Sequence, residues 1–267
     1  MRIVRYRHES GSGYGILANG RIAPVKDPFT WNAPGAPVYH PEPVGASDLE
    51  LDAVQLLTPC RPSKIVCIGV NYHAHAAEMG KAAPAEPMIF LKSPSAVLNH
   101  GGTILRPPDS ERVDHEAELG VVIGRPCRHV PAERAHEVIF GYTCVNDVTA
   151  RDLQRKDVQF SRAKSFDTFC PFGPWIETEL DPSDLGVEAR VNGEVRQSGR
   201  TRDLIHDVPK LVAFISRVMT LMPGDLIATG TPEGVGPLVA GDRVEITVEG
   251  VGTLANGVED DPVRMTI

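Results

Sequence analysis

The amino-acid sequence predicts an α+β fold built mainly from short β-strands. Short apolar runs bounded by turn residues recur along the chain, whereas few segments have the periodicity of a long helix. Two Asn-Gly pairs, Asn19-Gly20 and Asn192-Gly193, each separate two such runs, and this dipeptide supplies the two positive-φ residues of a type I′ hairpin turn. Many short strands with hairpins and few long helices are typical of an α+β fold.

The composition limits the classes of function. The 267 residues are 42% hydrophobic, enough for one large domain or for one domain with a small appendage. The 27 basic and 35 acidic side chains give a net charge of −8 without a basic run, which argues against nucleic acid or an anionic membrane as a partner. No apolar run reaches the roughly 18 residues of a membrane span, and the first residues lack a signal-peptide core. We therefore expect a soluble, cytoplasmic protein.

The first part of the chain is expected to form a small β-rich unit. Residues 14–18 and 21–25 flank the first Asn-Gly pair as the strands of a hairpin. Residues 28–43 are rich in proline and lack a regular apolar pattern, which indicates a linker or covering loop. We therefore place a domain boundary near residue 60, with the N-terminal domain and linker in residues 1–60 and the main domain in residues 61–267.

The main domain is expected to contain more strands than helices. Alanines between residues 71 and 80 favour a short helix that Gly80 ends. Asp207 followed by Pro209 predicts the N-terminus of an amphipathic helix over residues 207–219. Short apolar runs predict strands at residues 64–70, 88–91, 103–105, 141–147, 221–229, 244–248, 252–254 and 263–267.

The five cysteines give no sign of a disulfide framework or a zinc site. Their number is odd, and no two of them form a C-x-x-C pair. Free cysteines of this kind behave as small apolar residues, so we expect them in the core.

Two glutamates open the apolar stretch of residues 114–124. Residues two apart on a strand share a face, so Glu116 and Glu118 are expected to project together. The apolar run from Leu119 to Ile123 predicts a buried strand directly after them. Two adjacent like charges indicate either a solvated strand edge or a pair of ligands for a cation, and the local sequence leaves both possibilities open.

His75 and Glu78 are three residues apart on the predicted helix of residues 71–80, so their side chains can touch. A carboxylate beside an imidazole stabilises its protonated form and selects its tautomer, as a general base requires. A surface pair on a short helix has the same spacing. By itself, the spacing favours the surface pair.

Further polar residues follow the predicted strand of residues 141–147. Asp147 stands at its C-terminal end, where α/β and mixed folds tend to place ligand groups. Arg151 and Gln154 have helical i, i+3 spacing and suit either an anionic substrate or a solvated helix face. Lys164 lies between aromatic residues without a neighbouring acid, and an ordinary surface lysine is the simplest interpretation.

The loop of residues 230–236 is rich in glycine but matches no nucleotide-binding motif. It lacks the Lys-Ser/Thr of a P-loop, and the strand-like residues 243–248 that follow exclude the strand-loop-helix context of a dinucleotide fingerprint. Its backbone N–H groups and the Thr231 hydroxyl are instead suited to approach a small anion.

Six blocks of residues then combine into one pattern, and their order carries more information than any single block. They are Asn71-Tyr72-x-x-His75-x-x-Glu78, His115-Glu116-x-Glu118-Leu119, Asn146 through Gln154, Lys164 through Thr168, Pro223-Gly224-Asp225 and Gly230 through Gly236. Together they resemble the fumarylacetoacetate hydrolase family over roughly residue 64 to the C-terminus. The resemblance implies a mixed β-sandwich roll as the catalytic domain, a small variable N-terminal domain, and a homodimer.

The resemblance also implies a role for each matching residue. Glu116, Glu118 and Asp147 match the metal-binding carboxylates of the family, which usually hold Mg²⁺, with Mn²⁺ or Ca²⁺ in some members. His75 and Glu78 match the dyad that activates water.

The remaining matches concern the substrate. Arg151, Gln154 and Lys164 match groups that bind substrate or stabilise its oxyanion, and Thr231 matches a contact to the substrate carboxylate. The animal hydrolase that names the family has an additional aspartate ligand before the dyad, where this chain has Ile68-Gly69. The chain is in this respect similar to the smaller acylpyruvase-like and 2-hydroxyhepta-2,4-diene-1,7-dioate isomerase-like members.

The implied chemistry starts from a 2-oxo acid that chelates a hard divalent cation through its carboxylate and 2-oxo oxygens. Water activated by His75 would attack C4 of a 2,4-dioxo acid of the acylpyruvate or fumarylpyruvate type, with Lys164 and Gln154 stabilising the oxyanion. We therefore expect a metal-dependent hydrolase of such a C–C bond. A 2-hydroxydienoate isomerase or tautomerase, or an oxaloacetate-type decarboxylase, would use the same residues.

Two other classes are less consistent with the sequence. A non-catalytic carboxylate-binding relative predicts the loss of a residue from the dyad, the ligands or Lys164, and none is missing. A nicotinamide oxidoreductase or P-loop enzyme lacks its strand-loop-helix motif. A small-molecule 2-oxo acid is thus the expected partner.

Overall fold

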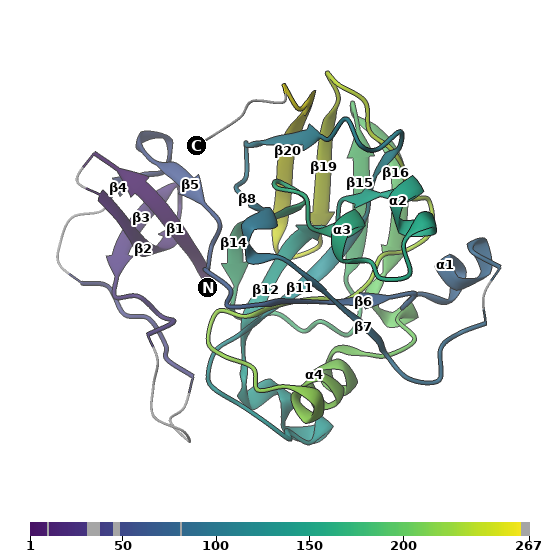
Figure 1. Cartoon of the computed structure of the whole chain (residues 1–267). Coiled ribbons are helices and arrows are strands. Elements are labelled where there is room, and N and C mark those ends of the chain that lie inside the picture. Colours follow the sequence, from purple (N-terminus) through teal and green to yellow (C-terminus); the bar gives the residue numbers. More distant parts are fainter. Residues whose placement is uncertain (10, 31–37, 45–48, 81, 263–267) are drawn as a thin grey trace.

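The computed structural model describes residues 1–9, 11–30, 38–44, 49–80 and 82–262. Within these residues the largest sheet has twelve strands and runs through the whole molecule (Figure 1). Its main order is β4-β3-β2-β1-β14-β12-β11-β17-β6-β7, and β5 and β8 pair with β1 and β14. These strands are β1 (Arg2–His8), β2 (Gly11–Ala18), β3 (Arg21–Val25), β4 (Leu49–Glu50), β5 (Gln55–Leu57), β6 (Ile65–Gly69), β7 (Met88–Lys92), β8 (Val97–Leu98), β11 (Ala117–Ile123), β12 (Ile139–Asn146), β14 (Cys170–Glu177) and β17 (Leu226–Ala228).

A second sheet packs on the centre of the first and makes the structure a mainly β fold, as predicted. In the described residues it has five strands in the order β16-β15-β19-β20-β9, and β15, β19 and β20 contact β11, β12 and β14 of the large sheet. A small sheet of order β13-β10-β18 lies beside the junction. The strands of these two sheets are β9 (Thr103–Arg106), β10 (Val113–His115), β13 (Thr149–Ala150), β15 (Gly186–Val191), β16 (Glu194–Arg200), β18 (Gly236–Pro237), β19 (Arg243–Val248) and β20 (Gly252–Asp260).

The helices are short, and the longest has the cap that the sequence predicts. The Asp207 side chain accepts a hydrogen bond from the backbone N–H of Lys210 at 3.0 Å, and Pro209 stands in the first turn. The buried face of this helix packs against η3 near the bottom of Figure 1. The helices are α1 (His73–Glu78), α2 (Arg151–Lys156), α3 (Ser161–Lys164) and α4 (Val208–Val218), with 3₁₀ turns η1 (Leu51–Ala53), η2 (Pro94–Ala96), η3 (Ala132–Glu137) and η4 (Thr201–Asp203).

Both predicted hairpins are confirmed. β2 and β3 join at Asn19-Gly20, with φ angles of 51° and 75°, and β15 and β16 join at Asn192-Gly193, with φ angles of 53° and 82°. Two successive positive φ angles define the type I′ turn. Gly80, which follows α1, also has a positive φ of 65° and ends that helix as expected.

The core centres on β11, which is buried along its whole length. β12 and β17 flank it within its sheet, and β15 and β19 of the second sheet pack on it. A Cβ atom on Gly120 would lie 2.6 Å from Val145 Cγ2, so the packing here requires glycine. Burial on both faces explains why residues 119–123 read as a continuous apolar run instead of an alternating one.

The stretch of residues 114–124 is not one strand, contrary to the prediction. β10 and β11 belong to different sheets, and Glu116 is the residue between them. The backbone N–H of Ala117 donates to Gln197 Oε1 at 2.9 Å, and that of Glu116 donates to Asn146 Oδ1 at 3.0 Å. Side-chain acceptors thus replace the strand ladder at the break.

Other expected elements differ at their ends. The predicted strand of residues 252–254 extends to Asp260, because Asn256 donates its side-chain N–H groups to the carbonyls of Asn99 and Gly102 at 2.9 Å and is satisfied inside the sheet. The predicted strand of residues 263–267 and part of the predicted linker, residues 31–37, lie outside the described residues.

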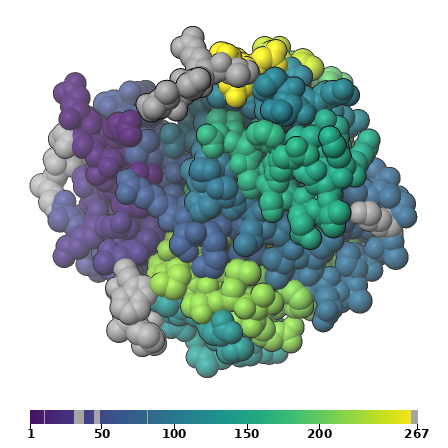
Figure 2. Space-filling view, viewed as in Figure 1, coloured from purple at the N-terminus to yellow at the C-terminus, as the bar shows by residue number. Residues whose placement is uncertain are grey.

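The N-terminal strands continue the large sheet. β1 pairs with β14 through Arg2 opposite Glu177 and Ile3 opposite Ile176. In Figure 2 this part of the chain, in purple, covers one side of the molecule. The boundary near residue 60 therefore stays a prediction. Among the described helices, none has the length and apolar character needed to cross a membrane.

Candidate metal centre

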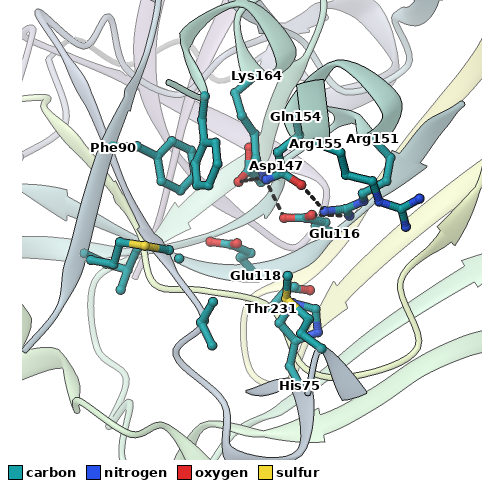
Figure 3. Close-up of a pocket in the computed structure, with 16 residues that line it drawn as sticks. His75, Phe90, Glu116, Glu118, Asp147, Arg151, Gln154, Arg155, Lys164 and Thr231 are labelled. Carbon is teal, nitrogen blue, oxygen red and sulfur yellow. Dashed lines mark hydrogen bonds and ion pairs between the residues drawn. The ribbon is translucent and has the colours of Figure 1, made fainter. Parts of the chain in front are cut away.

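Three buried carboxylates meet where the sheets adjoin. Glu116 stands between β10 and β11, Glu118 lies on β11, and Asp147 follows β12 (Figure 3). β11 and β12 are antiparallel with Ala117 opposite Asn146, so the flanking acids come together from two strands. One oxygen of each carboxylate lies within 4.8 Å of one from each of the others, and all three residues are at most 5% exposed.

Two lysines neutralise part of this charge. Lys164 Nζ lies 2.8 Å from Glu116 Oε2 and 2.6 Å from Asp147 Oδ2. Lys92 Nζ lies 2.6 Å from Asp147 Oδ1 and donates to the Val148 carbonyl at 3.0 Å. Both lysine residues are 2% exposed.

The interpretation of Lys164 as an ordinary surface residue is therefore wrong. It ends α3, which packs against β7 and β13, and its ammonium also lies 5.0 Å from the centre of the Phe90 ring. The acids that pair with it are 17 and 48 residues away in the sequence. Its local neighbours therefore contain no sign of its burial.

Arg151 is also occupied by acidic partners. Its Nε donates to Asp114 Oδ2 at 2.9 Å, its Nη2 to Glu116 Oε1 at 2.5 Å, and its Nη1 to Gln154 Oε1 at 2.6 Å. Arg151 and Gln154, two of the three predicted substrate-binding residues, line the cavity that contains the carboxylates. Because several of the Arg151 donors are in use, its geometry is suited to holding Glu116 in place. Its role as a substrate ligand stays a prediction.

The electrostatics differ sharply between the two glutamates. Burial alone would raise the pKa of Glu116, but the cations of Lys164 and Arg151 outweigh burial and hold this pKa well below its usual range. Burial raises the pKa of Glu118 well above its usual range, and the charges of Asp147 and Glu116 raise it further. Glu118 accepts the Gly230 N–H at 2.8 Å and forms no ion pair with any described residue. Of the three carboxylates, Glu118 is thus the one without a positively charged partner among the described residues.

His75 and Glu78 form a hydrogen-bonded pair beside the carboxylates. His75 Nδ1 lies 2.9 Å from Glu78 Oε2. A carboxylate accepts hydrogen bonds, so Nδ1 is the donor in this pair and Nε2 is the ring nitrogen that Glu78 does not bind. Glu78 Oε1 also accepts the Gly234 N–H at 3.2 Å. His75 is 5% exposed and lines the cavity, so the simple surface pair is wrong for the histidine.

The cavity has two connected parts, an inner chamber of about 180 Å³ and an outer chamber of about 420 Å³. The inner chamber contains the three carboxylates and Lys164. The outer chamber contains Glu78 and extends towards Arg112 and Asp114. Five residues line both chambers and mark their junction, namely His75, Met79, Arg151, Gln154 and Arg155.

Thr231 lines the inner chamber, but its hydroxyl proton is already used. Thr231 Oγ1 donates to the Ala117 carbonyl at 2.9 Å and accepts from Gln197 Nε2 at 2.8 Å. A hydroxyl has one proton, so this group does not donate to an anion in the same geometry. The predicted contact of Thr231 with a substrate carboxylate stays a prediction. Gln197 Oε1 also accepts from His115 Nδ1 at 3.0 Å, and burial lowers the pKa of that histidine.

Sequence reasoning missed Lys92, Asp114, Phe90 and Gln197. A signal for Lys92 was present, because residues two apart on a strand share a face. Met88 and Phe90 of β7 line the inner chamber, and Lys92 continues that face. No comparable signal existed for Gln197, which lies on β16 far along the chain.

The site fits a hard divalent cation. The donor set consists of three carboxylates, and oxygen anions are the ligands that Mg²⁺, Mn²⁺ and Ca²⁺ prefer. Glu118 has a raised pKa and no ion-pair partner in the described part of the chain, so the site lacks positive charge on that side. Glu116, Glu118 and Asp147 are the residues that would hold the ion.

Family models match almost the whole chain. Residues 64–259 match the model described as Fumarylacetoacetate (FAA) hydrolase C-terminal. The chain belongs to the fumarylacetoacetate hydrolase family. Residues 1–59 match the model described as Rv2993c-like, N-terminal. The resemblance that the sequence motifs predict and the mainly β fold with a small N-terminal β domain are thereby confirmed.

Curated relatives include proteins with and without a named activity. Protein Rv2993c of Mycobacterium tuberculosis is 53% identical over 208 residues, which cover 77% of this chain and 78% of that protein. Oxaloacetate tautomerase YisK of Bacillus subtilis is 45% identical over 230 residues, which cover 80% of this chain and 76% of that protein.

Solved structures of the same fold include isomerases and a hydrolase. The 5-carboxymethyl-2-hydroxymuconate delta-isomerase from Mycobacterium smegmatis is 47% identical, with a TM-score of 0.88 over 98% of this chain and 100% of that chain. The 2-hydroxyhepta-2,4-diene-1,7-dioate isomerase from Mycobacterium marinum is 43% identical, with the same TM-score and coverage. Maleylpyruvate hydrolase from Sphingobium sp. SYK-6, solved with manganese(II) and pyruvate, is 36% identical, with a TM-score of 0.77 over 97% of this chain and 99% of that chain.

Proposed function

We propose that this protein is a divalent-metal-dependent tautomerase or isomerase of 2-oxo acids. The observation that supports it best is the inner chamber, where a buried carboxylate triad faces a histidine held by a glutamate. C–C bond hydrolysis is less favoured, because relatives that share 43–47% identity with this chain are named as an oxaloacetate tautomerase and isomerases, whereas solved structures named as hydrolases share 36–38%.

The substrate would bind through its 2-oxo acid end. Glu116, Glu118 and Asp147 would hold Mg²⁺, or Mn²⁺ as in the Sphingobium relative. The ion would supply Lewis-acid stabilisation for negative charge on the carboxylate and 2-oxo oxygens. With these three residues as its protein ligands, the ion would be able to accept those two oxygens as further ligands.

His75 would move the proton. Its Nε2 is the free ring nitrogen and would take a proton from C3 of the substrate, while the C–H electron pair forms the C2=C3 double bond and O2 becomes negative. Return of that proton from His75 to the 2-oxo oxygen gives the enol. A 2-hydroxydienoate would start as such an enol: His75 would take the proton of its 2-hydroxyl group, the C2=O bond would form, and the proton would return to C3 or C5 to give the 2-oxo isomer. No electron is gained or lost overall. Glu78 stabilises the imidazolium that forms between the two transfers.

Lys164 would compensate the charge that develops on oxygen. Asp147 and Glu116 outweigh burial and raise the pKa of Lys164 above its ordinary value, so it stays an ammonium at neutral pH. An ammonium that is 2% exposed stabilises an oxyanion more strongly than it would in bulk water. Gln154, which lines both chambers, is the adjacent neutral group and would orient the bound acid.

C–C bond hydrolysis is the second candidate, because the His75–Glu78 pair is equally suited to activate water. In that reaction water would add to C4 of a 2,4-dioxo acid, and the C3–C4 bond would break to release the enol form of pyruvate. The 36% identical maleylpyruvate hydrolase supports keeping this candidate. Oxaloacetate-type decarboxylation would need the same charge stabilisation but no attacking water.

A substrate panel separates these reactions. The purified full chain is assayed with Mg²⁺ or Mn²⁺ against oxaloacetate, a hydroxymuconate-type dienoate, acetylpyruvate and fumarylpyruvate, with His75→Ala and Glu116→Gln as inactive controls. We expect keto-enol conversion of oxaloacetate or isomerisation of the dienoate, and its loss in both variants and with a chelator. Faster release of pyruvate from the dioxo acids would favour hydrolysis. Full activity in either variant would contradict both.

The expected assembly is a homodimer. This part of the prediction rests on the family alone, and light scattering of the purified chain tests it directly.

A further inference from the structure

The outer chamber has an arginine that the proposed reaction does not use. Arg155 lies in the last turn of α2, one turn after Arg151, and lines both chambers (Figure 3). In the described part of the chain its guanidinium makes no hydrogen bond and no ion pair. An arginine facing a cavity without an acidic partner has all of its donors available to a ligand.

The other charged groups of the outer chamber are already paired. Asp114 accepts from Arg112 Nε at 2.8 Å and from Arg151 Nε at 2.9 Å. Glu78 is bound to the His75 ring and to a backbone N–H. The chamber thus contains three guanidinium groups and two carboxylates, and the charge of Arg155 is left over. The chamber is therefore electrostatically suited to an anion.

The position of Arg155 determines which part of a ligand it can reach. The 2-oxo acid end of a substrate belongs in the inner chamber with the carboxylate triad. A longer chain has room past the junction, which Arg155 shares with His75 and Gln154, in the outer chamber of about 420 Å³. A negative group at the far end of that chain would meet Arg155, and a guanidinium binds a carboxylate through two parallel hydrogen bonds.

We propose that Arg155 binds the second carboxylate of a dicarboxylic 2-oxo acid and makes the protein selective for dicarboxylates over monocarboxylates of equal length. The inference rests on the proposed function, because it requires the first carboxylate to bind in the inner chamber. It names a specificity residue in the outer chamber and adds no group to the proton transfer.

The test compares two ligands that differ in the second carboxylate. The full chain is titrated calorimetrically, in the presence of Mg²⁺, with 2-oxoglutarate and with 2-oxopentanoate. We expect tighter binding of 2-oxoglutarate to the wild type. Arg155→Gln should lower the affinity for 2-oxoglutarate by about tenfold to 100-fold, as expected for the loss of a charge-assisted hydrogen bond. The affinity for 2-oxopentanoate should change by less than about twofold.

The chain offers a matched control at the next position. Lys156→Gln removes the same charge from the same turn of α2, and Lys156 is exposed like Arg155 but lines neither chamber. We expect it to leave both affinities unchanged. Arg155→Lys should retain part of the preference, because it keeps the charge and loses the paired hydrogen-bond geometry.

The kinetic result should follow the same pattern. For the dicarboxylate substrate that the assay panel identifies, Arg155→Gln should raise KM and leave kcat nearly unchanged, since Arg155 does not touch the reacting atoms.

The outcomes separate the two proposals. If Arg155→Gln weakens both ligands equally, weakens neither, or acts no differently from Lys156→Gln, the inference about Arg155 is overturned while the proposed function stands. If the wild type binds no 2-oxo acid with Mg²⁺ or Mn²⁺, the proposed function fails and the inference fails with it.

Discussion

The inner and outer chambers of the cavity are built in opposite ways. The floor of the inner chamber consists of Glu116, Glu118, Asp147 and Lys164, all at most 5% exposed, on or beside the strands of the core. The wall of the outer chamber comes mainly from α1 and α2, helices of six residues each, together with Arg112, Asp114 and Val235, and its Glu78 side chain is 40% exposed. Charges that are buried and paired keep one geometry, whereas exposed charges such as those of Glu78 and Arg155 are free to meet different ligands. The floor is thus suited to the chemistry, and the wall to the choice of substrate.

The floor stabilises the protein only while its charges stay matched. A buried charge is costly in isolation, and removal of one partner from a buried ion pair typically costs about 3–5 kcal/mol. Lys92 and Lys164 hold the two oxygens of Asp147 separately, so each carboxylate oxygen has its own cation. Glu118 is the exception, because in the described residues its only polar partner is a backbone N–H.

The largest expected effect is the loss of metal binding from the floor. Replacing Glu116 and Glu118 together by Gln removes two of three charged ligands, and we expect Mg²⁺ and Mn²⁺ affinity to fall by at least about 100-fold. Isothermal titration measures it. Glu194→Gln, at a side chain 70% exposed on a distant hairpin, is the matched control. Binding that survives the double replacement would show that the ion sits elsewhere.

The next effect separates the histidine from the floor. His75→Ala should lower kcat/KM by about 10²–10⁴, the usual contribution of a general base, and leave metal affinity within about twofold. The exposed His136 on η3 provides the control substitution to alanine. A parallel loss of metal affinity would mean that His75 belongs to the metal centre instead of facing it.

Replacing Lys92 tests whether the ion pairs of the inner chamber contribute to the stability of the protein. Lys92→Met leaves Asp147 with one lysine, and we expect the metal-free protein to lose about 3 kcal/mol of unfolding free energy, the low end for a broken buried pair. Mg²⁺ should stabilise this variant more than the wild type, because the ion replaces the missing charge. Urea unfolding with and without Mg²⁺ measures both. Lys210→Met, at a side chain 61% exposed on α4, should cost less than about 0.5 kcal/mol.

Glu78 should behave as a member of the exposed wall. Glu78→Gln keeps the side-chain size but removes the charge that stabilises the His75 imidazolium, and we expect kcat, measured with the substrate that the assay panel identifies, to fall about tenfold. Protein stability should change by less than about 0.5 kcal/mol, as for a surface position. A large loss of stability would place Glu78 with the floor.

The last expected effect is the pH dependence of stability that Glu118 causes. Its folded-state pKa is raised, so the folded metal-free protein keeps a proton that the unfolded chain releases above its ordinary pKa of 4.5. Stability should therefore fall as pH rises from this value towards the raised pKa, by at most about 1.4 kcal/mol per pH unit. His115 acts in the opposite direction, because its pKa is lowered and the folded state favours its neutral form. The difference between wild type and Glu118→Gln, measured in a chelator, isolates the glutamate. Identical pH profiles would contradict the raised pKa.

Much of the fold follows from local sequence. The two Asn-Gly hairpins and the Asp207 cap of α4 are confirmed, because turn conformation and capping depend on a few adjacent residues. The buried strand after Glu118 is also confirmed, because a continuous apolar run is typical of a strand that is buried on both faces. The break at Glu116 was not predictable, because it depends on Asn146 and Gln197 from other strands.

For the candidate site too, some features follow from the sequence and others only from the tertiary structure. The sequence by itself determined the family, through six ordered blocks, and with it the set of residues to examine. Only the tertiary structure decided that Lys164 is buried, that Lys92 pairs with Asp147 across 55 positions, and that Arg155 is left without a partner among the described residues. Turn and strand preferences act between neighbours in the chain. Burial and ion pairing depend on which distant segments fold together, and that information is spread over the whole sequence.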